Sequence, residues 1–254
     1  MVAAVPQTLE HWLQAGLLNA GLIAAASRAP LLTPRGWVHA AALGTILWGC
    51  LGPAGWLAVV AYLALGSLVT RLGFERKQQQ GLAEARGGRR GPENVWGSAA
   101  TGALLALLTP LLAPAARPVL LVGFVASFAA KLADTFGSEI GKRWGRHTVL
   151  ITSLRPVPAG TEGAVSLEGT AASLAGGLLM TLIGAGLGLV PPQLPLLALL
   201  TAVALVATLI ESLIGATAQR RWRCLSNELV NGLQTAIAAL LAMALVFPAL
   251  LTGR

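Results

Sequence analysis

Several apolar stretches of about 20 residues constrain this chain most, because each is long enough to cross a hydrocarbon core of about 30 Å as an α-helix. Eight spans are predicted near residues 8–28, 36–51, 54–73, 94–113, 117–141, 166–190, 194–217 and 227–251. Proline and glycine residues mark most of the turns between them. Strong alternation with a period of two residues is absent. We therefore expect an all-α, polytopic transmembrane helix bundle that forms a single integral membrane domain over residues 1–254.

The composition agrees with a membrane protein. Hydrophobic residues make up 55% of the chain and charged residues only 11%, whereas soluble domains carry about 25% charged residues. No Lys or Arg precedes Arg28, so the first apolar segment lacks the basic region of a signal peptide and is expected to stay in the protein. The cysteines and histidines are scattered without metal-ligand spacing, which argues against a metal site built from them.

The basic residues predict how the chain is oriented. A net charge of +8 would also suit a nucleic-acid-binding protein. However, 15 of the 18 Lys and Arg residues lie in alternate loops, as the positive-inside rule expects, and we therefore expect no nucleic-acid partner. The odd-numbered loops are predicted to be cytoplasmic, and both termini are predicted to lie on the opposite side of the membrane. This membrane is expected to be the plasma membrane or another internal membrane. The odd-numbered loops include a basic loop at residues 73–93, expected to be mobile or a short interfacial helix, and a glycine-rich loop at residues 142–166.

The fifth predicted span carries a polar face where it leaves the membrane. Its polar residues recur at offsets of 3, 4, 7, 8, 11 and 12 residues, which places them in one stripe of a helix. The stripe comprises Lys131, Asp134, Thr135, Ser138, Glu139, Lys142 and Arg143. Because charge inside a bilayer is costly, such a stripe predicts a functional site. A structural ion pair between Lys131 and Asp134, and a surface-anchoring role for Lys142 and Arg143, stay open as alternatives.

Other acidic and amide side chains are predicted at the same side of the membrane. They include Asn94, Glu162, Glu168, Glu211 and Glu228. One polar site at the cytoplasmic mouth of the bundle would explain this distribution. Two other interpretations stay open: Glu211 pairs with an arginine of the seventh loop, and Arg89 and Arg90 act only as a topology signal.

The glycine-rich loop supplies the second part of the predicted site. Its glycines and hydroxyls allow close backbone approach to a ligand, and they are Gly160, Thr161, Gly163, Ser166, Gly169 and Thr170. The following helix offers free N–H groups to an anion, and Lys142 and Arg155 would neutralise phosphate charge. Asp134, Glu139 and Glu168 are candidate Mg²⁺ ligands, because Mg²⁺ prefers carboxylate and phosphate oxygens. These groups together indicate phosphoryl transfer, although a Walker A loop is absent from the sequence.

Two sequence motifs resemble a known family. ADTFGSEIGK (Ala133–Lys142) and TSLRPVPAGTEGAVSLEGTAAS (Thr152–Ser173) are similar to the integral membrane family that includes the phytyl-phosphate kinases of plants and cyanobacteria. RRGPENVWGSAATG (Arg89–Gly102) also resembles its bacterial members. Within the second motif, SLEGT resembles the nucleotide-associated motif of dolichol and phytol kinases, which use CTP and are distant relatives of CDP-diacylglycerol synthase. This chain has Val165 where that pattern has a lysine, a role that Arg155 or Lys142 would take over.

The resemblance implies a membrane enzyme that transfers the γ-phosphoryl group of CTP to phytyl phosphate. The product, phytyl diphosphate, would serve phytol salvage and the synthesis of tocopherol or other prenylquinones. Asp134 and Glu139 would bind Mg²⁺, Glu168 would orient the metal or the nucleotide, and Lys131 and Lys142 would contact phosphates. Gly160–Gly163 and Ser166–Thr170, which include Thr161, Gly169 and the other glycines and hydroxyls named above, would wrap the nucleotide. The remaining predicted residues would bind the substrate or the nucleotide, and they are Asn94, Thr135, Ser138, Arg155 and Glu228.

Three other functions fit parts of the pattern. A cytidylyltransferase that makes a CDP-lipid would use the same nucleotide and metal. A transporter would carry an acidic pathway, but transporters usually bind substrate near the middle of the membrane, whereas the ionisable residues here crowd one side. A purely structural membrane protein is the last alternative. The sequence therefore favours a lipid phosphate and a nucleotide triphosphate as partners, with membrane lipids around the helices.

Overall fold

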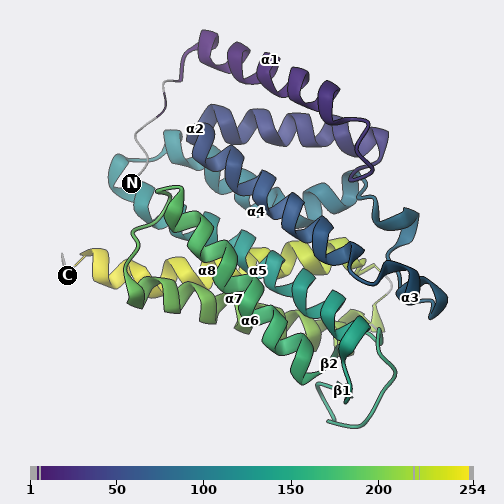
Figure 1. Cartoon of the computed structure of the whole chain (residues 1–254). Helices are drawn as coiled ribbons and strands as arrows, with labels where there is room; N and C mark the ends of the chain where they lie inside the picture. Colours follow the sequence, from purple (N-terminus) through teal and green to yellow (C-terminus); the bar gives the residue numbers. More distant parts are fainter. Residues whose placement is uncertain (1–4, 6, 220, 223, 252–254) are drawn as a thin grey trace.

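The computed structural model describes residue 5 and residues 7–219, 221–222 and 224–251, and within them the chain is an all-α helix bundle, as predicted (Figure 1). Its main helices are α1 (Leu9–Ala26), α2 (Pro34–Arg71), α3 (Phe74–Gln79), α4 (Pro92–Leu111), α5 (Arg117–Trp144), α6 (Leu167–Gly186), α7 (Leu194–Ile214) and α8 (Asn227–Leu251). Three short helical turns are η1 (Ala85–Gly88), η2 (Pro114–Ala116) and η3 (Gly215–Gln219). Two short strands, β1 (Val149–Leu150) and β2 (Ala164–Val165), pair antiparallel.

The long helix α2 consists of two limbs that fold back on each other at Gly52. Gly52 has a φ of 67° and a ψ of −158°, a conformation that interrupts the helix. A Cβ on Gly44 would lie 3.1 Å from Nε1 of Trp56, although these residues would be about 18 Å apart along a straight helix. The rings of Trp48 and Trp56 also lie 5.8 Å apart. The two limbs therefore correspond to the separate spans predicted at residues 36–51 and 54–73.

Five helices of the described residues are long and apolar enough to cross a membrane. They are Pro34–Arg71, Pro114–Trp144, Leu167–Gly186, Leu194–Gln219 and Asn227–Pro248. With α1, α4 and the division of α2, the helices coincide in position with the eight predicted segments. The polytopic helix bundle is thus confirmed.

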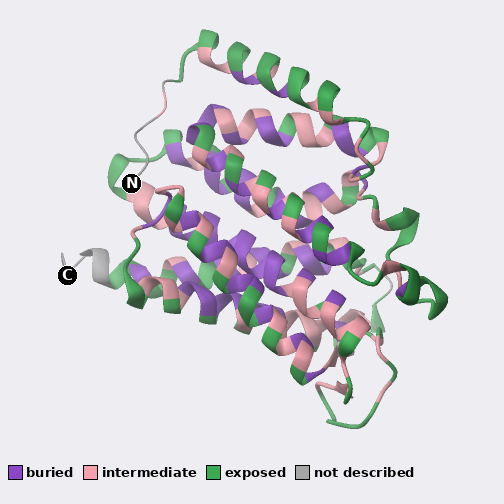
Figure 2. Ribbon diagram, in the orientation of Figure 1, coloured by how far each residue is buried: buried purple, intermediate pink, exposed green. Residues whose placement is uncertain are grey.

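Helix α5 runs through the centre of the bundle and packs against α2, α4, α6, α7 and α8 (Figure 2). Its residues from Leu120 to Ala133 are buried without interruption. Phe124 and Phe128 stack at 5.1 Å between ring centroids, and a Cβ on Gly102 of α4 would lie 2.5 Å from the Phe128 ring. Close packing around α5 leaves its polar stripe, which begins at Lys131, facing protein rather than lipid.

Candidate functional site

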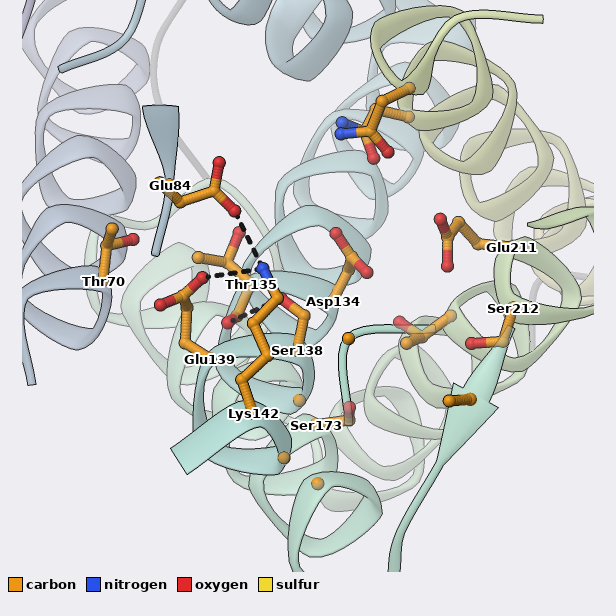
Figure 3. A pocket seen from close by; sticks show the side chains of 18 of the residues that line it. Thr70, Glu84, Asp134, Thr135, Ser138, Glu139, Lys142, Ser173, Glu211 and Ser212 are labelled. Atoms are coloured by element: carbon orange, nitrogen blue, oxygen red, sulfur yellow. Dashed lines mark hydrogen bonds and ion pairs between the residues drawn. The ribbon is translucent and has the colours of Figure 1, made fainter. Parts of the chain in front are cut away.

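A cavity of about 380 Å³ lies where the Trp144 end of α5 meets the loops on either side of it. Its walls come from α2, α4, α5, α6, α7 and α8, from residues 84–90, and from the glycine-rich loop. Figure 3 shows labelled side chains from several of these elements pointing into one space. Segments that are far apart in the sequence therefore build one polar site.

The polar stripe of α5 forms one wall of this cavity. Six of its seven residues line the space, namely Lys131, Asp134, Thr135, Ser138, Glu139 and Lys142. The seventh, Arg143, instead stacks on the Trp144 ring at 4.8 Å and packs against Gly73. This position agrees with the surface-anchoring alternative for Arg143.

The structure brings most of the other predicted site residues to the same cavity. These are Asn94, Gly160, Thr161, Gly163, Ser166, Gly169, Thr170 and Glu228. Two predicted residues do not line it. Arg155 is exposed in the glycine-rich loop, and the Glu168 carboxylate instead accepts a hydrogen bond from the Arg146 backbone N–H at 3.4 Å.

Helical periodicity explains why Glu168 lies apart from its neighbours. Ser166, Gly169, Thr170 and Ser173 share one face of α6 and line the cavity. Glu168 follows Ser166 by two positions, so it points about 200° around the helix axis from it. The carboxylate is therefore on the side of α6 away from the cavity.

The first turn of α6 is held against α5 by small residues. Ser166 caps the helix by accepting a hydrogen bond from the Gly169 N–H at 3.1 Å. A Cβ on Gly137 would lie 2.0 Å from Oγ of Ser173 and 3.1 Å from the Gly169 carbonyl oxygen. A Cβ on Gly163, which has a φ of 75°, would lie 2.4 Å from Cβ of Ala216. The amino end of α6 is thereby fixed at the cavity, in the place predicted for an anion.

The three carboxylates predicted to bind Mg²⁺ do not converge. The described residues contain no group of three or more His, Cys, Asp or Glu side chains arranged to hold a metal ion. Glu139 is 2% exposed and pairs with Lys77 and, at 3.4 Å, with Lys142, while Glu168 lies outside the cavity. Asp134, paired with Lys131 at 2.5 Å, faces Glu211 across the cavity (Figure 3). Mg²⁺ in phosphate sites usually takes one or two protein carboxylates together with substrate oxygens. The carboxylates of Asp134 and Glu211 fit that requirement.

The segment between α2 and α4 contributes residues that the sequence did not identify. Lys77 is fully buried and donates to the Glu139 carboxylate and, at 2.7 Å, to the Thr70 carbonyl oxygen. Glu84 pairs with Lys142 at 3.0 Å (Figure 3). Arg90 donates a hydrogen bond to the Tyr62 hydroxyl at 2.8 Å. A short helix, one of the two alternatives predicted for this segment, is present as α3, and residues 84–90 form a wall of the cavity.

The charge of Glu84 is set by its surroundings. Burial disfavours the ionised carboxylate, but the charge and hydrogen bond of Lys142, together with the charges of Lys131 and Arg90, outweigh this effect. The pKa of Glu84 is therefore lower than its ordinary value. Glu84 is thus an ionised partner of Lys142 at neutral pH.

Comparison with known proteins gives one family and several relatives. The family model described as integral membrane protein DUF92 matches residues 17–239. The chain is 50% identical to an uncharacterized membrane protein of Synechocystis sp., over 91% of this chain and 90% of that protein. It is 39% identical to protein VTE6, chloroplastic, of Arabidopsis thaliana over 84% of this chain and 64% of that protein. It is 30% identical to an uncharacterized membrane protein of Methanocaldococcus jannaschii over 84% of each chain. No solved structure matches.

Proposed function

We propose that this chain, which belongs to the integral membrane protein family DUF92, is a membrane prenyl-phosphate kinase. It would transfer the γ-phosphoryl group of CTP to phytyl phosphate and release CDP and phytyl diphosphate. The similarity to the Arabidopsis protein VTE6 and the motif resemblance to phytyl-phosphate kinases support this proposal. The observation that carries it is one polar cavity, lined by cations, carboxylates and a helix amino terminus, at the end of an apolar bundle.

For phosphoryl transfer, the protein mainly has to position the two reactants and stabilise the charge on their phosphates. An oxygen of the acceptor phosphate attacks the γ-phosphorus of the nucleotide, the bond to the β-phosphate oxygen breaks, and CDP leaves with the electron pair. The second pKa of a phosphate monoester is about 6, so the acceptor is largely a dianion at neutral pH. The reaction therefore needs no strong general base.

Residues on different walls of the cavity would have different roles in the reaction. Ser166, Gly169 and Thr170 at the start of α6 would face the nucleotide phosphates, with the two hydroxyl groups as hydrogen-bond partners and the positive end of the helix dipole attracting the phosphate charge. Lys142 would neutralise charge near them. Mg²⁺ would arrive with the nucleotide, with Asp134 and Glu211 as its protein ligands, and would offset the charge on the phosphates. Glu139, held between two lysines, would set the position of Lys142 rather than bind the metal.

The test is a product assay with purified protein in lipid nanodiscs, supplied with Mg²⁺, phytyl phosphate and CTP. The expected products are phytyl diphosphate and CDP, detected by mass spectrometry. Phytol and phosphatidate serve as alternative acceptors, and ATP, GTP and UTP as alternative donors. Turnover of phosphatidate or phytol without turnover of phytyl phosphate would sink the acceptor assignment, and preference for another nucleotide would sink the CTP assignment.

A further inference from the structure

Arg90 is held in the cavity by more contacts than a topology signal requires. Its backbone N–H donates to the Leu31 carbonyl and its carbonyl accepts from the Thr33 N–H, both at 3.0 Å. Its guanidinium fits a notch at Gly66, where a Cβ would lie 2.6 Å from Nη2. The same group donates to the Tyr62 hydroxyl at 2.8 Å and stacks over that ring at 5.1 Å. The backbone, the notch and the phenol therefore fix the guanidinium before any ligand binds.

A second cation lines the same cavity as Arg90 and Tyr62. It is Lys131 of α5, whose ammonium donates to Asp134 at 2.5 Å and to Asn231 at 2.9 Å. The Tyr62 and Lys131 side chains are buried, at 4% and 6% exposure. Two cations thus converge at the inner end of the cavity, far from its exposed loops.

The two cations differ in their partners. Lys131 has Asp134 as its partner, but Arg90 forms no direct ion pair with a carboxylate in the part of the chain that the structure describes, and the Glu84 carboxylate acts on it only at longer range. A half-buried guanidinium without an anion is unfavourable, because its desolvation is not offset. The inner end therefore suits an anionic ligand, and a guanidinium fork matches the oxygens of a phosphate group.

Position within the bundle separates two sources of phosphate. Tyr62 and Lys131 line the inner end from the middle of the second limb of α2 and the middle of α5, two helices long and apolar enough to cross a membrane, and Ser98 joins them from the second turn of α4. Gly160 and Thr161 line the outer end, where the loop is exposed to water. The phosphate of a lipid would enter the cavity from among the helices. A nucleotide would instead bind at the outer, water-exposed end, which leaves room for its base and ribose.

We infer that Arg90 and Lys131 form the binding site for the acceptor phosphate monoester of a lipid, at the inner end of the cavity. The inference rests on the proposed kinase function, which it deepens by separating the acceptor subsite from the nucleotide subsite. Tyr62 and Gly66 are positioning residues, because they orient the Arg90 guanidinium and do not themselves need to contact the substrate.

The test measures binding without turnover. Thermal unfolding is followed in nanodiscs with phytyl phosphate or with phytol, which has the same tail without the phosphate, and without nucleotide. Phytyl phosphate should raise the Tm above the value with phytol in the wild type. Arg90→Gln should lose this increment, and Arg28→Gln, which changes an exposed arginine outside the cavity, should keep it. Gly66→Ala, which fills the notch and leaves the charge in place, should also reduce the increment.

Kinetics then assign the subsite. Arg90→Gln should raise the KM for phytyl phosphate about tenfold or more, since a bidentate phosphate contact is lost, and leave the KM for CTP within about twofold. A raised KM for CTP alone, or a Tm increment that survives both Arg90→Gln and Gly66→Ala, would overturn the subsite assignment while leaving the kinase function intact. An Arg90-dependent increment in a protein that transfers no phosphoryl group would uphold the subsite and reject the kinase.

Discussion

Charged residues in and beside the cavity are arranged as ion pairs, and this arrangement predicts which substitutions matter. Glu139 and Lys77 are almost completely buried and form an ion pair with each other. Removing one member of such a pair leaves an uncompensated charge and costs about 3–5 kcal/mol. Asp134 and Lys131 are also paired, but both of them line the cavity, whereas Lys77 does not. The first pair is therefore expected to govern stability and the second to govern activity.

Lys77→Met should destabilise the protein strongly, because the buried Glu139 loses its closest partner and keeps only Lys142, at 3.4 Å. A loss of about 3–5 kcal/mol corresponds to a fall in Tm on the order of 10 °C for a chain of this size. Lys142→Met should cost less, since Glu139 keeps Lys77. The double variant Lys77→Met/Glu139→Gln should recover part of the loss. A Lys77→Met protein as stable as the wild type in thermal unfolding would refute the role of this pair.

Asp134→Asn should lower kcat about 100-fold or more while the protein still inserts and folds. The substitution removes a carboxylate that faces the proposed nucleotide and metal, and transition-state charge stabilisation of this kind is worth such a factor. Glu93→Gln is the matched control, because Glu93 lies outside the cavity in an exposed ion pair with Arg86. Steady-state kinetics with unchanged kcat in Asp134→Asn would show that the carboxylate has no part in the reaction.

At the level of helices, the packing of α5 against α6 determines whether the amino end of α6, the proposed anion site, lies at the cavity. Gly137 has no room for a side chain because Ser173 and Gly169 pack directly against it. The α5 stripe and the first turn of α6 therefore pack closely only while the side chains in this contact are small.

Gly137→Ala should destabilise the protein by about 1–3 kcal/mol, as overpacking usually does, and should raise the KM for the nucleotide. Ser173→Ala in the same chain should restore much of both, because it removes the oxygen that would lie 2.0 Å from the new Cβ. Gly186→Ala is the control, since nothing lies within 4 Å of its added Cβ. If Gly137→Ala binds nucleotide and unfolds like the wild type, the close α5–α6 packing does not position the site.

The elements also show what a sequence can predict. The spans and the α5 stripe follow from hydropathy and helical periodicity, which are local properties, and both are present in the structure. Lys77 escaped detection because its partner Glu139 lies 62 residues away in the chain. The sequence left open whether Arg90 is only a topology signal, because its partner Tyr62 lies 28 residues away. Only the packing of α3 and residues 84–90 onto α5 and α2 brings them together. Glu168 was predicted from its motif, but the direction of its side chain depends on how α6 is rotated against α5.

On the scale of the whole molecule, the cavity opens at one end of the bundle, and the sequence predicts that this end is cytoplasmic. The natural cysteines report on this orientation. Cys224 is exposed in the connection between α7 and α8, near cavity residues Ser212 and Asn227, whereas Cys50 is 2% exposed near the turn in α2.

A membrane-impermeant maleimide should label Cys224 in inverted bacterial membrane vesicles and not in intact cells. Cys224→Ser should abolish the labelling, because Cys50 is buried. Labelling of Cys224 from the outside of intact cells would place the cavity on the opposite side and contradict the predicted topology.

In the proposed function, the γ-phosphoryl group of CTP is transferred to a prenyl phosphate that is bound in the same cavity. The most direct test supplies phytyl phosphate with CTP that carries ³²P in either the α or the γ position. We predict that the γ label appears in the lipid diphosphate and the α label in CDP, and that Asp134→Asn abolishes the transfer. The α label in the lipid and the γ label in pyrophosphate would instead identify a cytidylyltransferase, and no label in the lipid from either CTP would contradict the account altogether.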